Sequence, residues 1–519
     1  MALRGTHSNL TEIRRRVFEE VARLAYEGGD YSRIVELPYR IIPGDKASYR
    51  DSIFLERAIV GERLRLAIGL PLRSIKDFVP VSDGIEESAI AEKYYDPPLV
   101  NVITYACNSC PSNRVTITNA CQDCLEHPCR EVCPKEAIHG RNGRSEIDYD
   151  KCIKCGRCIK VCPYHAIVKL ERPCEAACGM NAIGSDEEGH AKIDYDKCVS
   201  CGQCLVSCPF GAIADKGQIF QVVHALQKKQ EVHAIIAPAF IGQFGKNITP
   251  EKNRSAFQDL GFTDVEEVAV GADLCTLEEA DDFLENVPEN LPFLATSCCP
   301  AWSVMAKTEF PEFKDCISMA LTPMVLTARR LKKEHPECRI VFVGPCAAKK
   351  LEASRRSIRS DVDFVLTFEE VMGMFAAKGI DLDSADFSEQ PLDEGTRAGR
   401  GFAVSGGVAR AVKERIHELD PDREINVVAA QGLNECRTML KLAKSGRYNG
   451  YLLEGMACPD GCVAGAGTLQ AVNRSAASVG RYLRQAELEH ASESPYADEA
   501  EELKVMYNEF SSEEENPEK

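Results

Sequence analysis

The sequence lacks the features that would direct it into a membrane, to export or onto nucleic acid. No apolar run approaches the roughly 18 residues that a membrane-spanning helix requires, so we expect no membrane insertion. Residues 1–16 are polar and contain no apolar core of a secretory signal, so we expect a cytoplasmic location. Lys and Arg number 62 against 80 Asp and Glu, and the net charge of −18 disfavours nucleic acid as a partner.

Cysteine is absent from residues 1–98, although the whole chain contains 25. Helical spacing of apolar residues over 10–26, and a second helical stretch over 52–70, predict a helical N-terminal region that covers or docks and carries no chemistry. At the other end, residues 476–519 predict a helical acidic tail, and we interpret its acidic run as a solvated surface rather than a docking element.

The number of cysteines points to metal ligation, because disulfides are rare in a chain of this length without an export signal. Sixteen of them lie between Cys107 and Cys208. The CxxCxxCxxxCP run occurs twice, at Cys152, Cys155, Cys158 and Cys162 and again at Cys198, Cys201, Cys204 and Cys208. This run is typical of bacterial ferredoxins, in which the fourth cysteine ligates the other [4Fe-4S] cluster of a pair. Zinc sites do not repeat such a run, so the pattern argues against zinc.

The other eight cysteines can be paired through internal repeats. Cys121, Cys124, Cys129 and Cys133 form a stretched version of the same run, so the exchange rule predicts one cluster on Cys121, Cys124, Cys129 and Cys162, and another on Cys133, Cys152, Cys155 and Cys158. The similar text after Cys133 (PKEAI) and Cys178 (GMNAI) predicts a third cluster on Cys178, Cys198, Cys201 and Cys204, and a fourth on Cys107, Cys110, Cys174 and Cys208. Residues 99–218 would then be a ferredoxin-like module with four [4Fe-4S] clusters, one pair inserted into the other. The spacing is also similar to that of the four-cluster electron-transfer subunits of molybdenum oxidoreductases, and other pairings of the ligands stay open.

From residue 230 onward, apolar strand-like runs alternate with helical patterns. We predict strands over 233–238, 292–295, 339–343, 363–367, 425–430 and 450–453, with helices such as 303–309 and 324–333 between them. This alternation favours parallel sheets with crossover helices, in which ligands bind where loops leave the carboxyl ends of the strands. The predicted fold class is therefore α+β and multidomain, with a helical N-terminal region, the iron–sulfur module and a two-lobed α/β domain of mostly parallel sheets over 219–475.

Three cysteine motifs follow predicted strands directly, at residues 296–302 (TSCCPAW), 344–350 (GPCAAKK) and 454–462 (EGMACPDGC). A buried cysteine after a strand often serves as a small apolar residue. Three such loops with Pro, Gly and Lys beside the thiols are hard to explain in that way.

These motifs resemble the three signature motifs of the [FeFe]-hydrogenases, and the resemblance covers roughly residues 101–475, with further similar stretches at 237–239, 271–274, 278–279, 402–408 and 431–433. It implies an H-cluster: a [4Fe-4S] cubane held by Cys299, Cys346, Cys458 and Cys462, and bridged through Cys462 to a two-iron subcluster with CO, cyanide and azadithiolate. It also implies that Lys349 hydrogen-bonds a cyanide, that Ala237 and Pro238 make backbone contacts, and that Met456 packs near the distal iron. Cys298 would pass protons to the dithiolate amine, and Glu279, Ser318 and Asp282 would continue the proton path.

Several positions depart from the better-studied members of that family. Gly344 stands where they have methionine, Met324 where they have glutamine, and Ala239 where they have serine. Asp282 replaces a glutamate and Asn286 an arginine, which leaves the outer end of the proton path open. These changes indicate a divergent branch. Cys275, Cys316, Cys338 and Cys436 have no role that the sequence assigns.

The resemblance implies a hydrogenase that interconverts two protons and two electrons with H₂, with ferredoxin or a similar small carrier and the maturation proteins of the two-iron subcluster as partners. Residues 130–172 carry ten Lys and Arg against six Asp and Glu, which is either a docking face for such a carrier or a solvated surface. Two alternatives remain: a slow H₂-sensing hydrogenase, and an iron–sulfur assembly relative without the two-iron subcluster. Retention of Cys298, Lys349 and Met456 argues against the latter.

Overall fold

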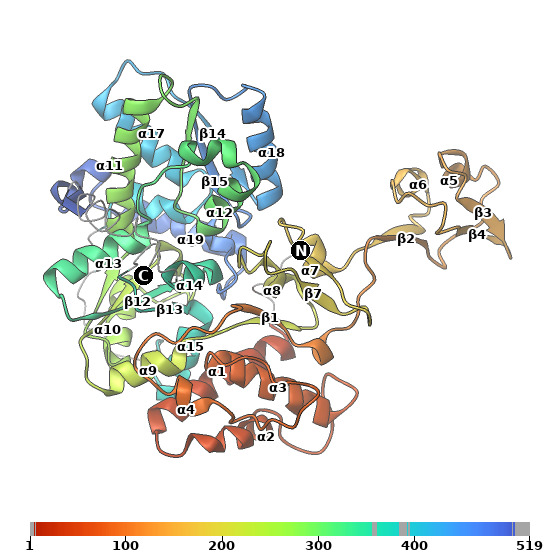
Figure 1. The fold of residues 1–519 in the computed structure, drawn as a ribbon, viewed down its shortest axis with the longest axis horizontal. Coiled ribbons are helices and arrows are strands. Elements are labelled where there is room, and N and C mark those ends of the chain that lie inside the picture. The colour runs from red at the N-terminus through yellow and green to blue at the C-terminus, as the bar shows by residue number, and fades with distance from the viewer. Residues whose placement is uncertain are drawn as a thin grey trace, which may run out of the picture.

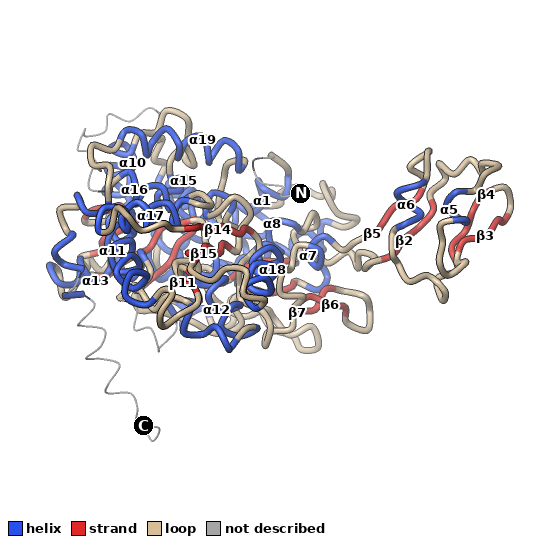
Figure 2. Tube along the Cα trace, turned by 90° about the horizontal axis from the view of Figure 1, so that it is seen from above, coloured by secondary structure: helices blue, strands red, loops and turns tan. Residues whose placement is uncertain are grey.

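The computed structural model describes residues 5, 7–354, 361–383, 392, 395–500 and 502–503. Three parts are visible in Figure 1: a helical N-terminal region, an α/β body, and a cysteine-rich module from which a slender arm projects away from the rest. Figure 2, seen from above, shows the same arm standing clear of the body. The predicted tail beyond residue 503 lies outside the described residues.

The described part of the N-terminal region contains several helices joined by irregular segments. The α-helices are α1 (Asn9–Glu27), α2 (Leu37–Ile41), α3 (Ile53–Ala67) and α4 (Ile85–Ser88). The Ser8 side chain caps α1 by accepting from Thr11 N, and the apolar face of α1 is buried. This face contacts helices α9 (Ile219–Gln227) and α15 (Phe368–Lys378), so the region shares one apolar core with the α/β body.

Short two-stranded sheets build the cysteine-rich module. In the part next to the body, β1 (Val100–Val102) pairs with β8 (Ile213–Asp215), and β6 (Ile183–Ser185) with β7 (Ala191–Ile193). In the arm, β2 (Arg114–Ile117) pairs with β5 (Ile167–Leu170), and β3 (Ile138–Arg141) with β4 (Arg144–Ile147). The module's helices are α5 (Pro128–Glu131), α6 (Arg157–Val161), α7 (Pro173–Ala176) and α8 (Gln203–Ser207).

Two parallel sheets form the α/β body. The first has the order β10-β9-β12-β13, with bounds Asp264–Glu267, Val232–Ile236, Arg339–Gly344 and Phe364–Thr367. The second has the order β11-β15-β14, with bounds Phe293–Ala295, Tyr451–Met456 and Asn426–Gln431. The prediction of parallel sheets is confirmed.

Helices surround these sheets. Besides α9 and α15 they are α10 (Pro250–Leu260), α11 (Ala269–Asn286), α12 (Pro300–Glu309), α13 (Pro323–Glu334), α14 (Ala347–Ser354), α16 (Arg397–Arg400), α17 (Gly407–Leu419), α18 (Leu433–Lys444) and α19 (Val472–Tyr482). Helix α19 crosses the boundary expected at residue 475, and its Tyr482 is buried against Glu267. None of the described helices is long and apolar enough to cross a membrane.

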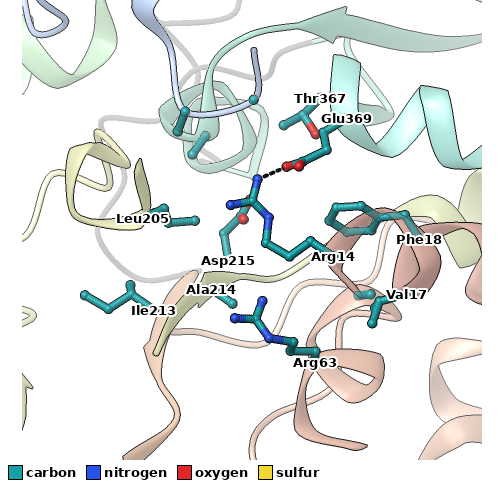
Figure 3. A pocket seen from close by; sticks show the side chains of 14 residues that line it. Arg14, Val17, Phe18, Arg63, Leu205, Ile213, Ala214, Asp215, Thr367 and Glu369 are labelled. Atoms are coloured by element: carbon teal, nitrogen blue, oxygen red, sulfur yellow. Dashed lines mark hydrogen bonds and ion pairs between the residues drawn. The ribbon is translucent and has the colours of Figure 1, made fainter. Parts of the chain in front are cut away.

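The three parts meet at a small pocket, shown in Figure 3. Arg14 of α1 reaches across it and forms an ion pair with Glu369 of α15 (Figure 3). Arg63 of α3 and Asp215 of β8 line the same pocket, so the N-terminal region, the cysteine-rich module and the body all contribute to it (Figure 3). The N-terminal region thus fastens the other two parts together.

Candidate functional site

The three motif loops leave the carboxyl ends of parallel strands and converge. Cys298 and Cys299 follow β11, and Cys299 is the N-cap of α12. Cys346 lies between β12 and α14, and the loop with Cys458 and Cys462 follows β15. Because β11 and β15 belong to one sheet and β12 to the other, the site lies between the two sheets.

One cavity collects most of the predicted residues. Its lining includes Ala237, Pro238, Ala239, Cys298, Cys299, Met324, Cys346, Lys349, Met456, Cys458 and Cys462. Side chains without a predicted role complete it, among them Val268, Ala272, Phe342, Phe402 and Ala403. The described wall is therefore apolar except for five thiols, two thioethers and one ammonium group.

Burial makes the thiols of this cavity weak acids. It raises the pKa of Cys346 to about 11 and that of Cys462 to about 12, and it raises the pKa of Cys299. The pKa of Cys458 is also raised well above its usual range, first by burial and then by neighbouring thiols. Four clustered thiols of this kind become thiolates when they ligate metal.

Lys349 is the one cationic side chain in the lining. Burial alone would lower its pKa, but Glu352, Cys346 and Cys298 raise it above the ordinary value. Its Nζ lies 2.7 Å from Glu352 Oε2, yet among the described residues it has no partner in hydrogen-bond geometry. A buried ammonium with unused donors suits an anionic ligand in the cavity.

The predicted proton path starts behind Cys298. Burial raises the pKa of Cys298 well above its usual range, and the nearby Glu279 adds to this rise, so the thiol stays protonated at neutral pH. Glu279 lies on the buried face of α11, where its Oε1 accepts from Ser297 N over 3.1 Å. Burial raises the pKa of Glu279 to about 8, while hydrogen bonds from Ser297 and Ser318 partly oppose the rise.

The outer end of that path follows helix α11. Asp282 is one turn after Glu279 and half-buried, and its charge contributes to the raised pKa of Glu279. Asn286 lies one turn further and donates from Nδ2 to the Asp282 carbonyl over 3.0 Å. Glu279, Asp282 and Asn286 therefore follow one another along α11, which ends at the half-buried Asn286, whereas Cys298 and Ser318 come from other segments.

Around Ala237 and Gly344, backbone and side-chain contacts within the protein limit what a ligand could use. The N–H of Ala237 donates to Val343 O over 2.9 Å, so this donor is used within the protein and is not available for a ligand. A Cβ added at Gly344 would lie 2.5 Å from Cε1 of Phe342. The Phe342 ring thus fills the space that a side chain at position 344 would need.

Two buried residues near Cys298 were missed by sequence reasoning or left without a role. Glu454 lies on β15, accepts from Gly406 N and Ala409 N over 2.6 and 2.9 Å, and raises the pKa of Cys298 through its charge. Cys275, one turn before Glu279, is fully buried, and after burial the neighbouring Glu279 and Cys298 raise the pKa of its thiol further. Cys316, Cys338 and Cys436 are buried outside the cavity lining.

The arm contains two further cysteine cavities. One is lined by Cys121, Cys124, Cys129 and Cys162, and the other by Cys133, Cys152, Cys155 and Cys158. In each, the fourth cysteine of one run joins three cysteines of the other. Backbone N–H groups also point at the sulfurs, since Ala137 N donates to Cys133 Sγ over 3.3 Å and Ser145 N to Cys121 Sγ over 3.5 Å.

The remaining eight cysteines of the module group in the same crossed manner. Burial raises the pKa of Cys174 and of Cys110. In both cases the thiols that raise it further are Cys107 and Cys208. After burial, Cys201, Cys198 and Cys178 raise the pKa of Cys204, and Cys174 raises it less. Helix α8, which carries Cys204, borders the body, because Gln203 contacts Cys458 of the main cavity.

Comparison with known proteins agrees with this arrangement. A family model described as "Iron only hydrogenase large subunit, C-terminal domain" matches residues 230–466, and a "4Fe-4S binding domain" model matches residues 145–168 and 191–214. Iron hydrogenase 1 of Clostridium pasteurianum is 30% identical over 387 residues, which cover 64% of this chain and 66% of that protein. Matches to three hydrogenases span between 55% and 66% of those proteins' own lengths.

A second group of relatives consists of proteins named as iron–sulfur assembly components. Cytosolic iron-sulfur assembly component 3 of Rattus norvegicus is 27% identical over 283 residues, covering 44% of this chain and 59% of that protein. Among solved structures, a variant of apo [FeFe]-hydrogenase HydA1 from Chlamydomonas reinhardtii matches with a TM-score of 0.45 and 22% identity, covering 53% of this chain and 89% of that one. By its motifs, the family-model matches and the 30% identity to the Clostridium pasteurianum protein, the chain belongs to the [FeFe]-hydrogenase family.

Proposed function

We propose that the chain is a catalytic hydrogenase that interconverts two protons and two electrons with H₂. One observation carries the proposal: the three motif loops place Cys299, Cys346, Cys458 and Cys462 in the same cavity as Cys298, Lys349 and Met456. The four cysteines alone would suit a simple cubane. The three additional side chains have a use only if a further group occupies the cavity.

The residues present fit an H-cluster. Four clustered thiols suit a [4Fe-4S] cubane, and Lys349 offers unused N–H donors to an anionic ligand beside it. Pro238 and Ala237 line the opposite wall. Such a cluster, when bound, supplies the redox-active iron at which H₂ is formed or split. The protein holds it through the cysteines and sets the polarity around it.

Cys298 is the proton donor and acceptor in this proposal. Its thiol is protonated at neutral pH because burial raises its pKa, so it can give up a proton only to a base placed in the cavity. Glu279 takes the proton onward, since its raised pKa of about 8 lets it exist in both forms near neutral pH. Asp282 and the surface follow along α11.

The sixteen cysteines of the front module would hold four [4Fe-4S] clusters that relay electrons. The crossed lining of the two arm cavities supports the exchanged pairing in the arm. The mutual charge effects of Cys107, Cys110, Cys174 and Cys208 support the nested pairing next to the body. Cys178, Cys198, Cys201 and Cys204 would then hold the cluster nearest to the main cavity.

Infrared spectroscopy of anaerobically matured protein tests the proposal. We expect CO and cyanide bands, H₂ evolution from reduced viologen, and about 22 irons per chain from five cubanes and one two-iron unit. Absence of the bands would favour an iron–sulfur assembly role, as in the second group of relatives. Bands with negligible H₂ evolution would favour a sensor. A small electron carrier, maturation proteins and a cytoplasmic location stay predictions.

A further inference from the structure

The two cavities of the arm have similar cysteine linings but opposite charges at their rims. Lys135, Lys154 and Arg157 line the cavity of Cys133, Cys152, Cys155 and Cys158. Among the described residues, no Lys or Arg lines the cavity of Cys121, Cys124, Cys129 and Cys162, and Asp123 is the one charged residue there. The sequence repeat alone gives no reason for this difference.

The three cations at the first rim are available to a partner. All three side chains are exposed, and none forms an ion pair with another described residue. By contrast, Asp123 at the second rim is held by Arg130 over 2.7 Å. These three side chains therefore form a positive surface on an otherwise acidic protein, and their charges are free to pair with carboxylates of another protein.

The first rim also contains a solvent-exposed cysteine. Cys155 is the exposed member among the 25 cysteines, all of which the structure describes. Next to it Ile153 is 57% exposed, and Val161 on α6 is exposed as well. Apolar side chains between cations are typical of a protein docking surface, whereas a small reductant would need no such contacts.

We propose that this rim, formed by Lys135, Ile153, Lys154, Cys155 and Arg157, is the port through which the chain exchanges electrons with an acidic redox protein. The inference rests on the proposed function, because it requires clusters in the arm. The partner presents carboxylates around its own redox centre, and these meet the three cations while its apolar contacts cover Ile153. One electron leaves the reduced partner and is taken up at the site of Cys133, Cys152, Cys155 and Cys158, with no bond made or broken.

The charge of the whole chain explains why the partner would arrive there. A net charge of −18 repels an acidic protein from most of the surface, while residues 130–172 carry ten Lys and Arg against six Asp and Glu. Steering of this kind raises association rates by about 10-fold to 1,000-fold at low salt. The projecting arm keeps the port away from the acidic body, as Figures 1 and 2 show.

The test compares two triple variants of the full, cluster-loaded chain. The port variant is Lys135→Gln, Lys154→Gln and Arg157→Gln. The matched control, Arg141→Gln, Arg144→Gln and Lys169→Gln, removes the same charge from exposed residues of the same arm that do not line either cavity and pair with Glu146 or Glu171. The probe is chemically reduced flavodoxin, an acidic protein whose flavin changes colour on losing one electron. Stopped-flow mixing then gives the rate of electron transfer.

We expect the port variant to lose at least about tenfold in second-order rate at low salt, and the control to stay within about twofold of the parent. The difference should vanish near about 0.5 M salt, where screening removes steering. Equal slowing in both variants, or no slowing in the port variant, would overturn the proposal. Iron content and electron paramagnetic resonance of each chain are recorded first, so that missing arm clusters refute the proposed function separately, and no H₂ assay enters the comparison.

Discussion

Gln203 donates a hydrogen bond from Nε2 to Cys458 Sγ over 3.2 Å. Gln203 lies between two cysteines of the front module, and Cys458 belongs to the last motif loop of the body. The contact joins residues 255 positions apart and links the two cysteine systems directly through side chains. It places the proposed relay directly against the proposed active site.

Replacing Gln203 by Ala should lower the midpoint potential of the cluster at Cys458. An N–H donor to a thiolate stabilises the more negative, reduced form, and a net hydrogen bond of about 1 kcal/mol corresponds to about 40 mV for one electron. Redox titration followed by electron paramagnetic resonance measures the shift. Gln122→Ala is the matched control, since Gln122 also lies inside a CxxC pair but is exposed and donates to Ala120 O. An unchanged potential in the Gln203 variant would contradict the prediction.

Cys298→Ala should retain the metal site and lose most of the turnover. Cys298 is not one of the four proposed ligands, yet it lines the same cavity. The charge of Glu279 raises the pKa of the Cys298 thiol, so the two groups lie close enough to interact. Loss of a positioned proton donor costs about 100-fold to 10,000-fold. H₂ evolution and infrared bands are the two measurements. Cys316→Ala, a buried cysteine outside the cavity, should keep its activity, and near-normal turnover of Cys298→Ala would refute the assigned role.

Glu279→Gln should stabilise the chain increasingly as pH rises. The pKa of Glu279 is raised from 4.5 to about 8 by burial, so the folded state holds the proton more tightly than the unfolded state. Its contribution to stability is intact below pH 4.5 and is lost as pH rises to about 8, at up to about 1.4 kcal/mol per pH unit. Glutamine cannot ionise and avoids this loss. Denaturation midpoints at pH 5.5, 7 and 8.5 test it, with exposed Glu285→Gln as the control. A gain that does not depend on pH would disprove the assignment.

The neighbouring lysines Lys349 and Lys350 should behave differently when changed to Met. Lys350 donates to Asp215 Oδ2 over 2.8 Å and to Glu370 Oε1 over 3.0 Å, and all three are away from solvent or nearly so. Its loss leaves carboxylates unpaired and should cost about 3–5 kcal/mol of stability. Lys349→Met should cost less stability, because its ion-pair partner Glu352 still accepts from Thr322 Oγ1 over 2.7 Å, and it should weaken retention of the two-iron unit.

Thermal unfolding and infrared spectroscopy separate the two lysine variants. Exposed Lys151→Met serves as the control for both, because its partner Asp148 stays hydrated. If Lys349→Met lowered the unfolding midpoint as much as Lys350→Met, then the role of Lys349 would be structural rather than toward a ligand.

Gly344→Ala should destabilise the chain, and Phe342→Leu should restore part of the loss. A Cβ at position 344 would lie 2.5 Å from the Phe342 ring and 3.2 Å from Ala237 Cβ, and such overpacking costs about 1–3 kcal/mol. The free energies of unfolding of both single variants and the double variant form a cycle that isolates this contact. Gly184→Ala, where nothing lies within 4 Å, should be nearly neutral. Additive effects in the cycle would show that Phe342 does not occupy the space.

Much of the body was predictable because its strands are continuous apolar runs. Each of the six predicted strands corresponds to an observed strand within a few residues. Strand β10 (Asp264–Glu267) was missed, since its sequence DVEE is mostly acidic. It forms nonetheless because it pairs with β9, and because buried Arg400 binds Glu267 over 3.0 Å. That partner is 133 residues away, so no local pattern reveals it.

The cysteines and Lys349 could be found from motifs, whereas the residues around them could not. In the sequence, Phe342 is an ordinary apolar strand residue. It can line the cavity because Gly344 has no side chain to occupy the space that the Phe342 ring fills. Glu454 precedes a motif cysteine, but its task of holding the start of α17 depends on a distant loop. Gln203 lies inside a CxxC pair, where the sequence draws attention to the cysteines and gives no sign of its contact with Cys458. In each case the decisive neighbour comes from another part of the chain.

The two ends of the arm lie side by side, because β2 and β5 pair antiparallel with Arg114 opposite Leu170. A segment that enters and leaves a fold at neighbouring points can be exchanged or lost without moving what it is attached to. Cys110 precedes the arm and Cys174 follows it, so the inner cysteine set would survive its removal. If the arm carries the proposed clusters, it is an exchangeable unit: replacing this one insertion would change the electron source and leave the chemistry at the core as it is.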